Sequence, residues 1–185
     1  SRLTVDRAPS KHPVFSPDGR RIAWTSWVAG MPDVYVLDRD SGDVTRLTWW
    51  SEATCATVRW ADDSHVIVAS GHAEGYVRRS MLYSVALDNT YERLPLGPAM
   101  SVAYGPEGAV VTATPCNRDS AMWKRYRGGT AARLWLDPHG AGEWRRVLPD
   151  EAAGLYAPDW LDGRLFFSAD IGDVGGVRRE QRVDV

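Results

Sequence analysis

The residues with the clearest capacity for chemistry in this chain form a basic and aromatic group, split between two separate stretches of sequence. Arginine and lysine pair with carboxylates and carbonyl oxygens, while tyrosine and tryptophan add flat apolar contact surface. The group predicts a rim that binds peptides or a partner. Its expected members are Arg78, Arg79, Trp123, Lys124, Arg125, Tyr126 and Arg127. The alternative is a solvated basic edge whose rings pack within the fold.

We expect no catalytic residue in this chain. Acyl transfer by serine needs a nucleophile, a base and an orienting group, and the sequence contains no Gly-x-Ser-x-Gly motif. Of the four histidines, one precedes the first strand, one follows a turn, one begins a long loop and one lies in a turn, and histidines at such positions commonly serve no chemistry. They are His12, His65, His72 and His139.

We also expect no metal and no cofactor. Residues 38–43 read Asp-Arg-Asp-Ser-Gly-Asp, like the start of an EF-hand loop, but the glycine comes one position early and Trp49 replaces the closing glutamate. A surface turn is therefore preferred. Cys55 and Cys116 fall at non-equivalent points of the chain, which argues against a disulfide framework and a zinc site. Trp49 and Trp50 could stack a ligand, although a core between sheets is preferred.

An internal repeat indicates which elements position these side chains. The string Phe-Ser-Pro-Asp-Gly-Arg-Arg-Ile-Ala-Trp at 15–24 returns in degraded form at 60–67, 104–111 and 160–167. Each copy is an aromatic residue, a tight Pro/Asp/Gly turn and a β-branched or aromatic run, which predicts two strands joined by a reversal. The aromatics are 45, 44 and 56 residues apart, near the roughly 40 to 50 residues of one propeller blade.

A third and a fourth strand recur in each unit. The third is predicted at 34–37, 82–85 and 134–136, and the fourth at 44–47, 91–94 and 144–148. No stretch shows helical periodicity over three turns, and Gly or Pro interrupts the chain at short intervals. The fold class is therefore all-β, with propeller blades of four antiparallel strands. A β-sandwich is the alternative, but it does not require the same four-strand unit to recur.

Composition limits the function classes. With 185 residues, 44% hydrophobic content, nine Trp and seven Tyr, the chain can bury a core of large rings between sheets. Its net charge of −2, with both signs interspersed, gives no reason to expect nucleic acid or an anionic membrane as partner. No apolar run is long enough to span a bilayer. A reducing cytoplasm is the expected compartment.

The Pro-Asp-Gly turn resembles the repeat of TolB-like propellers, and a longer block narrows the resemblance. Residues 123–130, Trp-Lys-Arg-Tyr-Arg-Gly-Gly-Thr, followed by Leu-Trp-Leu at 134–136, resemble the six-bladed propeller of the tricorn protease family. The order of neighbouring segments is similar too, from Asp33-Val34-Tyr35 to Gly163-Arg164-Leu165, and the resemblance covers about residues 10 to 172.

This resemblance implies a parent enzyme that is a large cytoplasmic serine peptidase degrading oligopeptides downstream of the proteasome. It also implies that catalysis lies in separate C-terminal domains. The propellers would admit substrate and release product, and the six-bladed one would contribute to a hexameric assembly. The chain itself would carry no catalytic residue. The rival interpretation is a free-standing TolB-like propeller that serves as a protein-binding scaffold.

The expected organisation is a propeller fragment. An outer strand of a preceding blade is predicted over 1–8, full blades over 9–50, 51–97 and 98–150, half a further blade over 151–176, and an atypical tail over 177–185. An open array leaves strand edges unpaired. We therefore expect homo-oligomers, with peptides and neighbouring domains or subunits of the same protein as partners.

Overall fold

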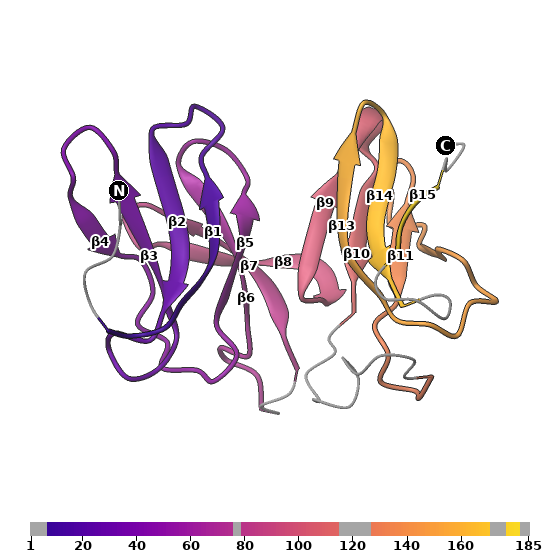
Figure 1. The fold of residues 1–185 in the computed structure, drawn as a ribbon, viewed down its shortest axis with the longest axis horizontal. Coiled ribbons are helices and arrows are strands. Elements are labelled where there is room, and N and C mark those ends of the chain that lie inside the picture. The colour runs from indigo at the N-terminus through magenta and orange to yellow at the C-terminus, as the bar shows by residue number, and fades with distance from the viewer. Residues whose placement is uncertain (1–6, 76–78, 115–126, 171–176, 182–185) are drawn as a thin grey trace. The chain divides into compact units, whose positions relative to one another are not determined.

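The computed structural model describes residues 7–75, 79–114 and 127–170, together with the backbone of 177–181. Their strands form four antiparallel sheets in which neighbours in sequence pair with one another (Figure 1). Contacts divide the chain into two compact units, unit 1 over residues 1–97 and unit 2 over residues 98–185. The prediction of an all-β chain with four-stranded antiparallel sheets is confirmed.

The first sheet of unit 1 contains the best-preserved copy of the repeat. Its strands are β1 (Ser10–Phe15), β2 (Arg21–Ser26), β3 (Asp33–Asp38) and β4 (Val44–Arg46). Between β1 and β2, Gly19 has a φ of 70° and its N–H donates to the Ser16 carbonyl over 2.9 Å. The Ser16 hydroxyl accepts the Arg21 N–H and donates to Asp18. Turn chemistry thus reverses the chain where the sequence predicted it.

The second sheet of unit 1 packs against the first. It contains β5 (Ala56–Trp60), β6 (His65–Ser70), β7 (Met81–Ala86) and β8 (Tyr91–Pro98). The core between the two sheets joins one face of β2 and β3, including Ala23 and Val34, to one face of β6 and β7, including Val66 and Tyr83. Inside this contact, Thr57 N–H donates to the Thr25 hydroxyl over 2.8 Å. The polar pair satisfies a backbone donor that would otherwise be buried without a partner.

The first sheet of unit 2 contains β9 (Ser101–Tyr104), β10 (Val110–Ala113), β11 (Leu134–Asp137) and β12 (Arg145–Arg146). A short 3₁₀ turn, Pro106–Gly108, joins β9 to β10. Just before it, a Cβ on Gly105 would collide with the Trp160 ring of the next sheet. The glycine is therefore required by a close approach of the backbone to an aromatic ring.

The second sheet of unit 2 has three described strands: β13 (Leu155–Leu161), β14 (Arg164–Ala169) and β15 (Val177–Gln181). It shares a core with the preceding sheet, in which Val111 and Leu134 meet Leu155 and Phe167. No helix in the described residues is long and apolar enough for a membrane span.

The end of the chain differs from the expectation of an atypical tail over 177–185. Residues 177–181 pair with β14 in a continuous antiparallel register, from Ala169 opposite Val177 to Leu165 opposite Gln181. The three predicted third strands each contain an aromatic residue, Tyr35, Tyr83 or Trp135, and residues 177–181 contain none. A ladder of backbone hydrogen bonds does not require one, so this sheet extends beyond the half-blade predicted over 151–176.

The aromatic residues that end the first strands of the repeat have different surroundings. Trp60 is buried, and its indole N–H donates to the Val14 carbonyl over 3.1 Å. Phe15, in the equivalent position one repeat earlier, is 62% exposed, and Tyr104 is 44% exposed. These aromatic residues therefore share their place at the end of a strand but not their burial or packing.

Candidate functional site

Two of the predicted rim residues lie in the described part of the chain. Arg79 precedes β7 in unit 1, and Arg127 lies before β11 in unit 2. The other predicted rim residues lie outside the described residues: Arg78, Trp123, Lys124, Arg125 and Tyr126.

Arg79 shares a carboxylate with a second arginine. Its Nε lies 3.7 Å from Glu74 Oε2, while Arg93 Nη1, from β8, donates to Glu74 Oε1 over 3.0 Å. The Glu74 side chain is only 10% exposed, whereas that of Arg79 is 55% exposed. Arg93 thus makes the close contact with the glutamate, and the Arg79 guanidinium is held loosely at the surface.

An aromatic cluster made of Trp50, His72, Tyr83 and Tyr91 accompanies this ion pair in unit 1. The Trp50 and His72 rings stack in parallel, with centroids 4.6 Å apart and planes at 7°. Tyr91 meets both rings edge-on, and its hydroxyl lies 2.9 Å from His72 Nε2. The Tyr83 hydroxyl donates to the His72 carbonyl. Burial first, then the charge of Glu74, raises the pKa of the Tyr83 phenol.

This arrangement suits binding and not acid–base catalysis. The polar atoms of the cluster are used in contacts that hold the loop between β6 and β7: His72 N–H donates to Ser70 Oγ, and Gly71 N–H donates to Thr54 Oγ1, both over 3.1 Å. Tyr83 is buried and Trp50 packs against the core, so the exposed part of this region consists of the Tyr91 ring, 50% exposed, and the Arg79 guanidinium. Such a surface can contact a peptide through stacking and carboxylate pairing.

His65 has the composition of a catalytic triad but not its geometry. Ser64 Oγ lies 2.9 Å and Asp62 Oδ1 3.0 Å from the same ring nitrogen, Nδ1. A triad places the nucleophile and the carboxylate on opposite ring nitrogens. The Ser64 backbone N–H, with the neighbouring hydroxyl and imidazole, lowers the pKa of Asp62 to about 2. The group is therefore a turn in which the carboxylate organises its neighbours.

In unit 2, Arg127 is tied to the end of β14. Its Nη2 donates to the Asp170 carbonyl over 3.0 Å, and Nη1 lies 3.5 Å from Asp170 Oδ2. Nearby in sequence, Arg133 donates to the Ala153 carbonyl over 2.9 Å and to the Ala152 carbonyl over 3.2 Å. These arginines hold the segments that flank β11 and β13.

Sequence reasoning missed most of the partners described above. Glu74 and Arg93 are 19 residues apart, and His72 and Tyr91 are as well, so no local spacing connects them. Only the pairing of β7 with β8 brings them together. The two adjacent tryptophans have different surroundings. Trp50 packs against the core of unit 1. Trp49 is 57% exposed, and the Arg46 guanidinium lies 5.2 Å from its ring centroid.

Comparison with known proteins agrees with this fold. The family described as the tricorn protease N-terminal beta propeller domain matches residues 1–177. Tricorn protease homolog 1 of Streptomyces coelicolor is 37% identical over 170 residues, covering 91% of this chain and 16% of that protein. The tricorn protease of Thermoplasma acidophilum is 24% identical over 173 residues, covering 88% of this chain and 16% of that protein.

Solved structures identify the architecture. The crystal structure of the tricorn protease superposes with a TM-score of 0.85 at 23% identity, over 98% of this chain and 18% of that chain. TolB from Acinetobacter baumannii gives a TM-score of 0.55 at 18% identity, over 85% of this chain and 39% of that chain. The predicted fold, a fragment of a β-propeller, is confirmed. The chain spans about a sixth of the length of the tricorn relatives named above.

Proposed function

Because the chain belongs to the tricorn protease N-terminal β-propeller family, we propose that it is the noncatalytic propeller part of a tricorn-like serine peptidase. The parent enzyme would degrade oligopeptides in the cytoplasm, downstream of the proteasome. The propeller would admit substrate and release product, and would take part in the assembly of subunits. The observation that carries this proposal is the family match, which extends over residues 1–177.

The surroundings of two histidines, His65 and His72, support the noncatalytic part of the proposal. His72 is stacked on Trp50 and contacts Tyr91 through Nε2. The Ser64 hydroxyl and the Asp62 carboxylate both contact the same ring nitrogen of His65, Nδ1. In the proposal, the nucleophile and its base belong to other parts of the parent protein.

The rim supports the channelling part. Arg79 lies 3.7 Å from a glutamate that Arg93 already contacts at 3.0 Å, so the Arg79 guanidinium can leave it for a peptide carboxylate at little cost. The half-exposed Tyr91 ring offers apolar surface for peptide side chains. The other predicted rim residues, Arg78 and 123–126, lie outside the described residues.

The scaffold alternative is less well supported. A TolB homolog of Chlorobaculum tepidum is 30% identical over 92 residues, which is half of this chain. The tricorn relative from Streptomyces is more similar over nearly twice that length. We therefore favour the peptidase.

Charge reversal in the full-length protein tests the rim. Arg79→Glu should raise KM for a free octapeptide by roughly two- to fivefold, the range expected for an exposed ion pair. A chromogenic dipeptide amide, which lacks a free carboxylate, should be hydrolysed as before. Arg20→Glu, in the β1–β2 turn where the wild-type side chain is 61% exposed, is the matched control. An equal change for both substrates, or none for either, would refute the channelling role of Arg79.

A second experiment tests the division of labour. A fluorophosphonate probe labels activated serines, and peptide mapping of the labelled full-length protein locates the modified residue. We expect the label outside residues 1–185. Labelling of a serine inside this range would overturn the noncatalytic assignment.

A further inference from the structure

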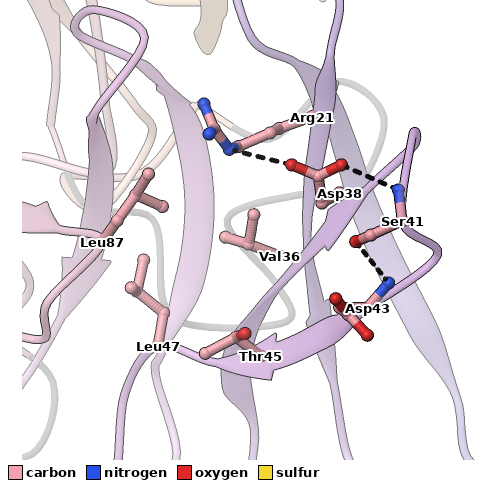
Figure 2. Close-up of a pocket in the computed structure, with 8 residues that line it drawn as sticks. All are labelled: Arg21, Val36, Asp38, Ser41, Asp43, Thr45, Leu47 and Leu87. Atoms are coloured by element: carbon pink, nitrogen blue, oxygen red, sulfur yellow. Dashed lines mark hydrogen bonds and ion pairs between the residues drawn. The ribbon is translucent and has the colours of Figure 1, made fainter.

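Unit 1 contains a cavity of about 250 Å³ that the proposed channelling role does not use. It lies between the β3–β4 hairpin and the start of the β7–β8 turn (Figure 2). Leu47 and Leu87 lie on one side, Asp38, Ser41 and Asp43 lie on the other side, and Val36 lies between them. The volume is below the range of roughly 300 to 1,000 Å³ typical of drug-sized ligands. The cavity is instead sized for one amino-acid side chain.

The carboxylates of Asp38 and Asp43, which both line the cavity, differ in their contacts with other residues. Asp38 accepts the N–H groups of Asp40 and Ser41 over 3.0 and 3.2 Å, and its other oxygen lies 3.7 Å from Arg21 Nε. Asp43 donates its own N–H to Ser41 Oγ over 3.2 Å. Within the described part of the chain, no cation contacts the Asp43 carboxylate. The cavity therefore presents a solvent-exposed carboxylate without a cationic partner among the described residues, opposite the partly exposed Leu87 side chain; Leu47 and Val36 are almost fully buried behind it.

The surroundings reinforce this charge, because the neighbouring turns meet at the same end of the two sheets. Asp18 N–H donates to Asp63 Oδ1 over 2.9 Å, and Leu87 N–H donates to the Ser64 carbonyl over 3.1 Å. Besides Asp38 and Asp43, the aspartates at this end are Asp18, Asp40, Asp62, Asp63 and Asp88. The arginines here are Arg20, Arg21 and Arg39. Carboxylates outnumber guanidinium groups, so the local field attracts cations.

We propose that this cavity binds the side chain of a lysine or arginine presented by a peptide or protein segment. The aliphatic stem packs against Leu87, with Leu47 buried behind it, and the cationic head lies beside Asp43 and Asp38. Long basic side chains combine an apolar stem with a charged end in this way. Asp43 is the specificity residue, since Asp38 already has Arg21 as a partner.

Saturation-transfer NMR with the full-length protein at low salt tests the proposal. The probe is acetyl-Gly-Lys-Gly-amide, and the comparison peptide replaces lysine by norleucine, which keeps most of the aliphatic stem without the ammonium group. We expect saturation transfer to the lysine side-chain protons and weaker binding of the norleucine peptide by roughly fivefold or more. Equal binding of the two peptides, or no transfer to the lysine side chain, would overturn the site.

Variants assign the binding to the cavity. Asp43→Asn should weaken binding of the lysine peptide roughly two- to fivefold, whereas Asp40→Asn, whose wild-type carboxylate is 68% exposed beside Arg20, should not. Thr45→Lys places an ammonium group in the cavity and gives the background from binding elsewhere. Equal effects of the two Asn variants, or a lysine signal unchanged in Thr45→Lys, would refute the assignment. Cadaverine binding as tightly as the peptide would show that a free amine, and not a polypeptide, is recognised.

Discussion

At the residue scale, an aspartate closes several of the tight turns from within. Asp18 accepts the Arg20 N–H, Asp62 accepts the Ser64 N–H and Asp88 accepts the Thr90 N–H, over 2.7 to 2.9 Å. Hydrogen bonds from hydroxyls and backbone N–H groups hold the pKa of each of these carboxyls below its usual range. Aspartate recurs in the repeat because its ionised side chain substitutes for missing backbone partners.

The turn aspartates predict an acid-sensitive fold. The pKa of Asp62 is about 2 in the folded chain against 3.8 for a free side chain, so its stabilisation is present above pH 3.8 and is lost as pH falls through about 2. Asp62→Asn should therefore reduce the loss of urea stability between pH 4 and pH 2, followed by tryptophan fluorescence. Glu143→Gln, at an exposed position away from these turns, is the control. An Asp62→Asn variant with the wild-type pH dependence would contradict the prediction.

A buried ion pair gives a second residue-scale prediction. The fully buried Asp33 carboxylate contacts Arg46 Nη2 at 2.5 Å and accepts the Thr48 hydroxyl over 2.8 Å. Asp33→Ala leaves the Arg46 charge and the Thr48 hydroxyl without their acceptor, so we expect β3 and β4 to open more easily by about 3 kcal/mol. Hydrogen–deuterium exchange of peptides from these strands in the full-length protein measures this change.

The matched control for that prediction is the exposed pair Arg20–Asp40, whose side chains are 61% and 68% exposed. Asp40→Ala should change the exchange by less than about 1 kcal/mol because solvent screens the pair. Comparable effects of the two alanine variants would show that burial of Asp33 does not set its contribution.

At the scale of the element, the close approach between β9 and β13 in unit 2 predicts an asymmetry between two glycines. A Cβ at Gly105 would collide with the Trp160 ring, whereas a Cβ at Gly129 would meet nothing within 4 Å. Gly105→Ala should destabilise unit 2 by about 1 to 3 kcal/mol through overpacking, and Gly129→Ala should be close to neutral. Thermal unfolding monitored by exchange in β13 peptides distinguishes them. Equal stability of the two variants would contradict the packing argument.

At the scale of the whole molecule, an incomplete propeller should not behave as a monomer by itself. Exposed sheet edges attract other strands, and β8 is an eight-residue edge strand with mostly exposed or half-buried side chains. We expect residues 1–185, expressed alone at tens of micromolar, to form oligomers or aggregates in light scattering. A monodisperse monomer would contradict this expectation.

The repeat made most of the fold predictable, because turn residues and alternating apolar runs are local signals. The sheets follow from such signals at residues 10–46 and 56–98. The third strand at 177–181 was missed because its evidence is backbone pairing with β14, which leaves no mark on residue type. The aromatic cluster was missed for a related reason: Trp50, His72 and Tyr91 meet only once the strand register is known.

The self-contained turn also bears on how such a chain arises. A turn closed by its own aspartate, as at Asp62 or Asp88, draws these hydrogen bonds from the next few residues and not from a neighbouring sheet. A duplicated gene segment would therefore encode a turn that forms from the residues of the new copy alone. Descendant copies could then diverge at their strand-end aromatics, as Phe15 and Trp60 do, without losing the reversal that defines them. Lengthening by duplication is thus open to this architecture, one heritable unit at a time.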